Sequence, residues 1–320
     1  MLPRKYSQRL SQNKGSLVFL PPHRILTGKI PVKRVNVYFI LGIQQLIAGG
    51  THIVAKAVLT DVDPVVLTFL RTVIAGAGLF ALASIRSRGL KIERGDWGRF
   101  ALLALLGVSL NQFLYLYGLQ FTTAANGALL YASTPVFVLL LSHFILKERI
   151  TPKKSVGIAT AFLGITIVIF ERGIDLTSGY AQGNMIILVG VIAWTLSMVL
   201  GKPLILKYGA LRTTTAMMVF GALLFAPFGL LSTLTFPLEK LAPVHWGGVL
   251  YLAIGTSILG YLLWYHALGR IEAGKVAVFA NAQPVIAALL ALVFLDYTIT
   301  TSFVMGSILT ISGIAVTQRG

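Results

Sequence analysis

Four positions in the first long apolar stretch of the sequence place polar or small side chains on one helical face. Gln45, Gly49, His52 and Lys56 follow one another at intervals of four, three and four residues, and residues so spaced lie on the same side of an α-helix. Because polar side chains are costly in lipid, this face should look into the protein. It predicts a ligand-binding surface, with hydrogen bonds between helices as the alternative. Lys56 lies near the end of the stretch, where its long side chain could instead reach water.

Arg71 carries the most informative charge, because it lies two turns inside the second apolar stretch. A guanidinium group at that depth needs carboxylates, carbonyls or an anionic ligand. One interpretation is that Arg71 bonds to groups of the preceding turn, such as Asp61 or Asp63. The other is that it binds the carboxylate of a substrate.

Two prolines, Pro135 and Pro284, interrupt apolar stretches, and amide or hydroxyl side chains precede each of them. Proline lacks the N–H group and clashes with the carbonyl four residues back, so in lipid the freed carbonyls need other partners. The two kinks are therefore candidates for the walls of a central cavity. The alternative is a structural kink in which Ser and Thr side chains satisfy their own helix.

Two further faces carry candidates: one holds Asn111, Gln112 and Tyr115, and on the other Tyr261 and Trp264 follow Ser257 at four and three residues. A shift of the sequence by 146 residues also places Lys56 on Lys202. Substrate-binding candidates are Gln45, His52, Asn111, Gln112, Tyr115, Asn126, Tyr131, Thr134, Trp194, Tyr261, Trp264, Asn281 and Gln283. Candidates for a charged gate or a carboxylate-binding group are Lys56, Arg71, Lys202 and Lys275.

Several kinds of chemistry lack their residues in this sequence. There is no Cys, no phosphate-binding G-x-x-x-x-G-K-[ST] loop and no H-E-x-x-H zinc motif. No Asp or Glu lies deep in an apolar stretch, so the deep groups that titrate near neutrality are His52 and His266. We therefore predict no catalytic residue, no metal and no cofactor, and a membrane-embedded enzyme is disfavoured. The energy source is not indicated.

The elements that must position these side chains are membrane-spanning helices. The chain is 56% hydrophobic and 12% charged, and apolar stretches of about 20 residues are long enough to cross a bilayer. The sequence predicts an all-α integral membrane protein with ten such helices. They are Val35 to Val58, Pro64 to Ile85, Trp97 to Leu119, Thr122 to Leu146, Pro152 to Phe170, Gly183 to Leu206, Thr213 to Leu231, Trp246 to Leu268, Ala273 to Leu295 and Thr300 to Val316.

The sequence also repeats itself at a shift of 149 residues, and such repeats determine the fold. Because five helices is an odd number, the second copy should enter the membrane from the opposite side, giving inverted-topology repeats with a site at mid-bilayer. Repeated residues are Leu119, Ala124, Ala128, Pro135, Leu140, Gly157 and Gly164, which become Leu268, Ala273, Ala277, Pro284, Leu289, Gly306 and Gly313. The parts are a basic tail (1–34), a first repeat (35–171), a connector (172–182), a second repeat (183–316) and a C-terminus (317–320).

The positive charge indicates how the chain sits in the membrane. Most of the 27 Lys and Arg residues lie in the tail and in every second loop, and Lys and Arg near span ends resist translocation. Both termini should therefore be cytoplasmic, in a plasma membrane. The basic, acid-free tail could alternatively target an organelle. A nucleic-acid partner is disfavoured, because the charge is distributed between apolar segments and not gathered on one face.

On these motifs the chain resembles the EamA family of the drug/metabolite transporter superfamily over residues 35 to 316. The matching features are Lys56, the Asp63-Pro64 turn followed by Arg71, Tyr117-Gly118-Leu119 leading to Thr134-Pro135, and the Lys147 to Thr151 link. Ala48 and Tyr297 depart from the family pattern, which often has Trp and Glu there. The resemblance implies ten helices in two five-helix repeats and export of small metabolites, often amino acids, across a bacterial inner membrane.

Together these observations predict a secondary transporter that exports aromatic or hydrophobic amino acids, or related compounds, by alternating access through a central cavity between the repeats. The alternative is an organic-phosphate or nucleotide-sugar exchanger, in which Lys56, Arg71 and Lys275 would act together on phosphate. The expected partners are a small-molecule substrate and the lipid bilayer, with the protein a monomer or a homodimer.

Overall fold

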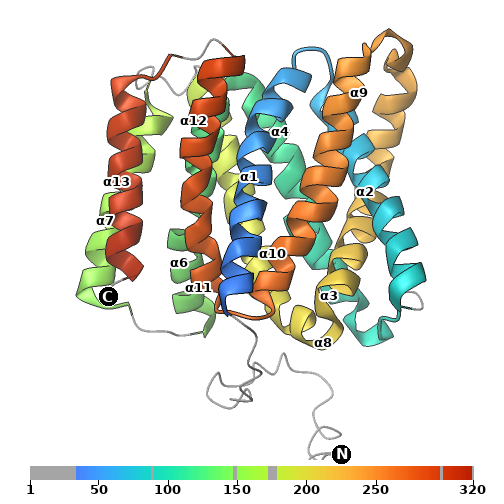
Figure 1. Cartoon of the computed structure of the whole chain (residues 1–320), viewed down its shortest axis with the longest axis horizontal. Helices are drawn as coiled ribbons and strands as arrows, with labels where there is room; N and C mark the ends of the chain where they lie inside the picture. The colour runs from blue at the N-terminus through green and yellow to red at the C-terminus, as the bar shows by residue number, and fades with distance from the viewer. Residues whose placement is uncertain (1–33, 88–89, 147–149, 172–178, 296–297, 319–320) are drawn as a thin grey trace, which may run out of the picture. The chain divides into compact units, whose positions relative to one another are not determined.

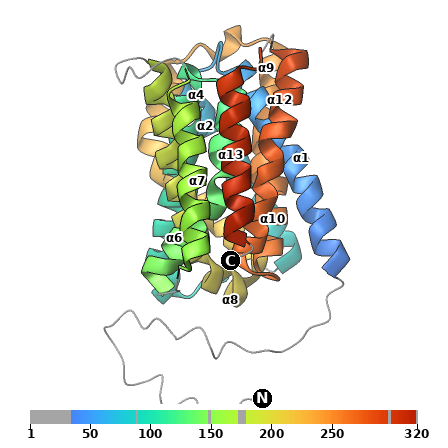
Figure 2. The same cartoon turned by 90° about the vertical axis from the view of Figure 1, so that its left-hand side faces the viewer.

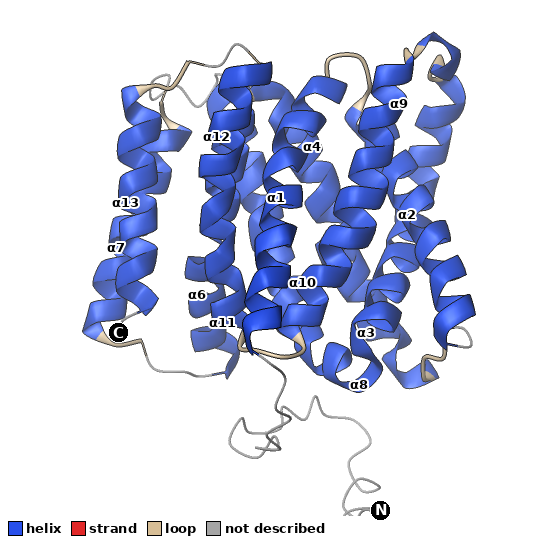
Figure 3. Ribbon diagram, in the orientation of Figure 1, coloured by secondary structure: helices blue, strands red, loops and turns tan. Residues whose placement is uncertain are grey.

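All secondary structure in the described part of the chain is helical. The computed structural model describes residues 34–87, 90–146, 150–171, 179–295 and 298–318, and no strand occurs among them (Figure 3). The predicted tail up to residue 33, most of the predicted connector and the positions of Glu148 and Tyr297 lie outside the described residues. An all-helical membrane fold follows from the long apolar stretches, because a helix satisfies every backbone hydrogen bond within its own segment.

The helices run side by side and are joined by short turns (Figure 1). In chain order they are α1 (Arg34–Val58), α2 (Pro64–Ser87), η3 (Arg94–Asp96), α3 (Trp97–Ala104), η4 (Leu105–Leu110), α4 (Asn111–Phe121), α5 (Ala124–Ala132), α6 (Thr134–Leu146), α7 (Pro152–Ile169), α8 (Gly179–Thr235), η5 (Leu238–Lys240), α9 (Pro243–Leu250), η6 (Tyr251–Gly260), α10 (Tyr261–Leu268), α11 (Ala273–Ala277), η7 (Val278–Ala282), α12 (Gln283–Phe294) and α13 (Thr301–Gln318).

Within the described residues, eight helices are long and apolar enough to cross a membrane. The count differs from the predicted ten at two places. Two predicted spans, Gly183 to Leu206 and Thr213 to Leu231, both lie within the 57-residue α8, which is interrupted at Gly209 by non-helical backbone angles (φ 78°, ψ 166°). The last predicted span corresponds to a shorter apolar helix, Thr301–Val316. A positive φ is readily adopted only by glycine, so Gly209 is where this long helix can bend.

The first proline kink satisfies its own backbone. Helix α5 ends at Ala132, and α6 begins at Thr134, directly before Pro135. Pro135 cannot bond to the carbonyl of Tyr131, and the hydroxyl of Thr134 donates to that oxygen instead, at 2.6 Å. The backbone before Pro284 differs from that before Pro135, because it forms the tighter 3₁₀ segment η7.

Wider, π-helical turns interrupt two further helices at corresponding places. The segment η4 lies between α3 and α4, and η6 lies between α9 and α10. Such segments are rare and occur frequently at functional sites. In η6 the hydroxyl of Ser257 donates to the carbonyl of Leu252, five residues back, at 3.0 Å.

Helices α7 and α13 form a close pair (Figures 1 and 2). A Cβ atom at Gly164 would lie 2.6 Å from the carbonyl oxygen of Gly306, and one at Gly313 would meet the backbone of Gly157 and Ala161. These four repeated glycines therefore lie where the two helix backbones approach each other closely, as small residues allow. The remaining long helices surround a polar interior: α8 packs against α2, α3 and α4, and α1 packs against α12 and η6.

Candidate functional site

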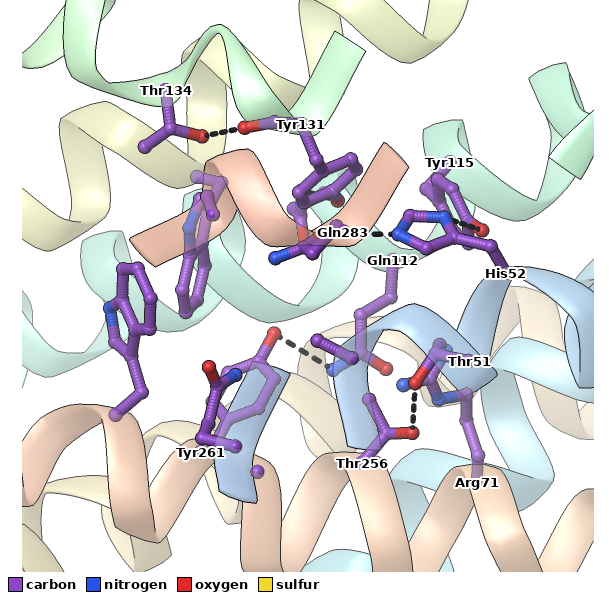
Figure 4. A pocket seen from close by; sticks show the side chains of 17 residues that line it. Thr51, His52, Arg71, Gln112, Tyr115, Tyr131, Thr134, Thr256, Tyr261 and Gln283 are labelled. Carbon is purple, nitrogen blue, oxygen red and sulfur yellow. Dashed lines mark hydrogen bonds between the residues drawn. The ribbon is translucent and has the colours of Figure 1, made fainter. Parts of the chain in front are cut away.

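A cavity of about 90 Å³ lies between helices that come from both halves of the chain (Figure 4). Helices α1, α2, α4, α5, α6, α8, α10 and α12 contribute to its walls, whereas α7 and α13 contribute none of its lining residues. The predicted residues that line it are His52, Arg71, Asn111, Gln112, Tyr115, Tyr131, Thr134, Trp194, Tyr261, Trp264 and Gln283. Lining residues that were not predicted are Gln44, Ala48, Thr51, Thr256, Gly260 and Ala280.

Arg71 is the charged group of this cavity. Its side chain is 2% exposed, and its Nε and Nη2 atoms donate to the hydroxyl oxygen of Ser257 at 3.2 and 3.0 Å. The expected alternative partners are engaged elsewhere. Asp61 accepts from Thr60 and lies 3.1 Å from the ring Nε2 of His245, and Asp63 accepts from backbone N–H groups at the start of α2.

The charge of Arg71 has no carboxylate partner among the described residues, and no Asp or Glu lines the cavity. A guanidinium group has five N–H donors, of which the bonds to Ser257 occupy only two. Burying a charge without a partner is costly. An anionic group in the cavity would meet both the charge and the remaining donors.

A chain of hydrogen bonds forms another wall and joins α1, α4 and α12. The hydroxyl of Tyr115 lies 2.7 Å from Nδ1 of His52, and Nε2 of His52 lies 3.0 Å from Oε1 of Gln283. Because the amide oxygen can only accept, Nε2 carries the hydrogen and Nδ1 accepts from Tyr115. Gln283 Nε2 then donates to Oε1 of Gln45 at 2.9 Å, and Gln45 Nε2 donates to Gln44. Both ring nitrogens of His52 are thus bonded, an arrangement that the neutral imidazole satisfies.

The opposite part of the cavity is aromatic. The ring of Trp194 lies 5.0 Å from that of Tyr261 and 6.2 Å from that of Trp264, measured between centroids. The hydroxyl of Tyr261 donates to the carbonyl of Gly107 at 2.8 Å and accepts from Nε2 of Gln112 at 3.2 Å. Among the residues that line the cavity, two buried polar atoms have no hydrogen-bond partner: Oε1 of Gln112 and Nε1 of Trp264.

Smaller polar contacts complete the walls. Asn111 donates to the hydroxyl of Tyr131 at 2.5 Å and to the carbonyl of Gly190 at 2.9 Å. The hydroxyls of Thr51 and Thr256 lie 2.7 Å apart, and Figure 4 shows both beside Arg71. Thr51 directly precedes His52 and Thr256 directly precedes Ser257, so each threonine lies on the face of its helix next to the predicted one. The predicted neighbours in the chain were the sequence signal for these two residues.

Some predicted site residues lie away from the cavity. Gln45 accepts a hydrogen bond from Gln283 but does not line the cavity. Asn126 donates to Glu171 and Tyr180 at the first turn of α5. Asn281 is not among the lining residues. Lys275 is exposed and forms an ion pair, at 3.2 Å, with Glu272, the residue before its helix α11.

Lys56 and Lys202 hold helix ends. The Nζ atom of Lys56 donates to the carbonyls of Leu119 and Gln120 at the last turn of α4, at 2.8 and 3.1 Å. Lys202 donates to the carbonyl of Ile271, just beyond α10, at 3.0 Å. Cations are favourable at helix C-termini, where carbonyl groups lack helical partners. Each of the two lysines predicted to correspond thus donates to a backbone carbonyl at or just beyond the end of a helix.

Replacing Tyr115 with Phe should lower the stability of the protein. The substitution leaves Nδ1 of His52 buried without a donor, and an unsatisfied buried acceptor costs about 1–3 kcal/mol. Thermal unfolding of the purified protein in detergent measures this loss. The matched control is Tyr117→Phe, two residues along α4, where the side chain is 40% exposed. Equal unfolding temperatures for the two variants would contradict the role given to Tyr115 in the chain of hydrogen bonds.

Comparison with known proteins shows which family the chain matches. Residues 27–170 and 181–319 each match the sequence profile of the EamA-like transporter family. The chain is 30% identical over 302 residues to the uncharacterized transporter YetK of Bacillus subtilis, covering 93% of this chain and 92% of that protein.

Two further similarities are more distant. The chain is 28% identical over 225 residues to a probable amino-acid metabolite efflux pump of Salmonella typhimurium, covering 67% of this chain and 75% of that protein. A solved structure described only as the crystal structure of a protein has a TM-score of 0.67 at 21% identity, over 89% of this chain and 96% of that one. This last likeness concerns the fold alone.

Proposed function

Because the chain belongs to the EamA-like transporter family, we propose that this multi-pass membrane protein is a secondary transporter that exports amino acids or related small carboxylates through the cavity around Arg71. The observation that carries the proposal is the pairing of Arg71 with a hydroxyl and, among the residues that the structure describes, with no acid, at 2% exposure in the wall of a cavity. Intramembrane charges of this kind mark substrate or ion pathways.

The substrate would use three parts of the cavity. Its carboxylate would bond to the N–H groups of Arg71 that Ser257 does not occupy, in the bidentate geometry that guanidinium favours. Its apolar part would lie against Trp194 and Tyr261. The wall formed by His52 and Gln283 would remain neutral, because each of its polar atoms already has a partner.

The proposed architecture has ten spans in two inverted repeats, with both termini in the cytoplasm of a bacterial cell. A straight helix of 57 residues would be about 85 Å long at 1.5 Å per residue, far longer than the roughly 30 Å apolar core of a bilayer. The break at Gly209 supports two crossings within α8. The corresponding π-helical segments η4 and η6 support a repeat, and so do the similar contacts of Lys56 and Lys202 with backbone carbonyls near helix ends. Alternating access would then move one part against the other about the cavity.

An exchanger of organic phosphates is the weaker candidate. It needs several cations on one ligand, and the structure gives Lys56 backbone carbonyls and Lys275 an exposed acid as partners. Arg71 alone of this predicted trio lines the cavity. One cation suits a carboxylate better than a doubly charged phosphate.

Counterflow tests the proposed function. Purified protein in proteoliposomes is loaded with one unlabelled compound, and uptake of its labelled form is followed for a panel of aromatic and branched amino acids, their carboxylate relatives, nucleotide sugars and sugar phosphates. We expect saturable exchange of amino acids or related carboxylates that inorganic phosphate does not inhibit. Exchange confined to phosphorylated compounds would overturn the proposal.

A further inference from the structure

A bound zwitterion would leave the positive charge of the cavity uncompensated. Arg71 contributes one positive charge, His52 is bonded as a neutral ring, and the other polar lining groups are amides, hydroxyls and indoles. A zwitterionic amino acid brings no net charge, so Arg71 would stay uncompensated and a second cation, the ammonium group, would be buried near it. A carboxylate without an ammonium group neutralises the site.

We infer that the cavity selects net-anionic monocarboxylates that have a ring-sized apolar body and a neutral hydrogen-bond donor where an amino acid carries its ammonium group. The inference rests on the proposed function and specifies its substrate class. It is distinct from that proposal, which holds equally for zwitterionic amino acids.

An unpartnered buried acceptor in the wall suits the neutral donor of such a ligand. Oε1 of Gln112 is an acceptor without a donor, and Nε1 of Trp264 is a donor without an acceptor. A hydroxyl group can donate to the amide oxygen of Gln112, and it carries no charge. An ammonium group could donate to the same oxygen, but it adds a positive charge beside Arg71.

The positions of these residues along one helix favour an elongated ligand. Ser257, Tyr261 and Trp264 follow at four and three residues, so the backbone of Trp264 lies about 10 Å farther along the axis than that of Ser257, the partner of Arg71. Figure 4 shows Arg71 and Thr256 at one side of the pocket and Tyr261 farther along it. A carboxylate joined to an aromatic ring by a short chain spans this arrangement.

A charge-matched ligand series tests the inference on the full-length protein. 3-Phenyllactate and phenylalanine differ only in the replacement of the ammonium group by a hydroxyl, 3-phenylpropionate lacks both, and phenethylamine lacks the carboxylate. Binding is measured by quenching of tryptophan fluorescence, since Trp194 and Trp264 line the cavity, and exchange by counterflow. We expect phenyllactate to bind at least about tenfold more tightly than phenylalanine, with phenylpropionate between them and phenethylamine unbound.

A substitution at Arg71 tests whether its charge causes the preference for phenyllactate over phenylalanine. Arg71→Gln should remove the preference for phenyllactate, and Arg86→Gln, the same substitution at an exposed position of the same helix, should retain it. Phenylalanine that binds as tightly as phenyllactate, or more tightly, would overturn the inference and leave the proposed function intact. Failure of all four compounds to bind would also overturn it. The counterflow panel would then decide separately whether the protein transports other amino acids.

Discussion

Replacing Arg71 with glutamine should reduce carboxylate transport by about 10- to 150-fold while leaving the protein at least as stable as the wild type. The loss of transport follows from the hydrogen bonds of a charged group, which contribute about 1.5–3 kcal/mol. Stability should not fall, because Arg71 has no acid partner among the described residues that would be left unpaired. Ser257 keeps its bond to the carbonyl of Leu252.

This combination separates a binding role from a structural one. Removing one partner of a buried ion pair is strongly destabilising, whereas removing an unpaired buried charge eliminates a desolvation cost. Counterflow in proteoliposomes measures transport, and thermal unfolding in detergent measures stability. Arg86→Gln on the same helix serves as the control and should change neither. A variant at Arg71 that unfolds at a markedly lower temperature would show that the guanidinium holds the fold together, contrary to its proposed role.

Helical periodicity could predict most of the cavity from the sequence. His52 belongs to a face with four- and three-residue spacing, and Tyr261 and Trp264 belong to another, so each residue could be assigned to the interior side of its helix. The same periodicity extends to Gln44, Ala48 and Thr51, which line the cavity on the adjacent face of α1. Periodicity determines which side of a helix a residue occupies, and the interior of a membrane protein is where polar sides face.

Periodicity does not determine which helices meet, and here the sequence was insufficient. Ser257 is separated from Arg71 by 186 positions, so their contact depends on the packing of η6 against α2. The sequence instead suggested the nearby acids Asp61 and Asp63, which local turns and His245 occupy. Local sequence favours local partners, and the deep position of Arg71 puts those partners out of reach.

The sequence also did not determine how far along its helix each candidate side chain lies from the cavity. Asn126 lies at the first turn of α5, where it bonds to Glu171 and Tyr180 and not to a ligand at the kink. Lys275 lies in the five-residue α11 beside Glu272, and it pairs with that acid at the surface. Each residue was predicted from its place before a proline, but the distance from the proline along the axis decides whether a side chain reaches the cavity.

Replacing Gly164 with alanine should destabilise the pair of helices α7 and α13. A Cβ atom there would lie 2.6 Å from both the carbonyl oxygen of Gly306 and the backbone nitrogen of Thr310. Backbone atoms cannot move aside as a flexible side chain can, so the helices must separate. Overpacking of this kind costs about 1–3 kcal/mol, which should lower the unfolding temperature in detergent.

The matched control is Gly42→Ala on α1, where an added Cβ atom would meet nothing within 4 Å. Alanine is the better helix former by about 1 kcal/mol, so this variant should unfold at the same temperature as the wild type or a higher one. Because α7 and α13 contribute no residue to the cavity, the Gly164 variant should still bind ligand at temperatures where it is folded. Equal unfolding temperatures for the two variants would mean that the helices are not in backbone contact at Gly164. Loss of ligand binding by the folded Gly164 variant would instead mean that this helix pair shapes the cavity from a distance.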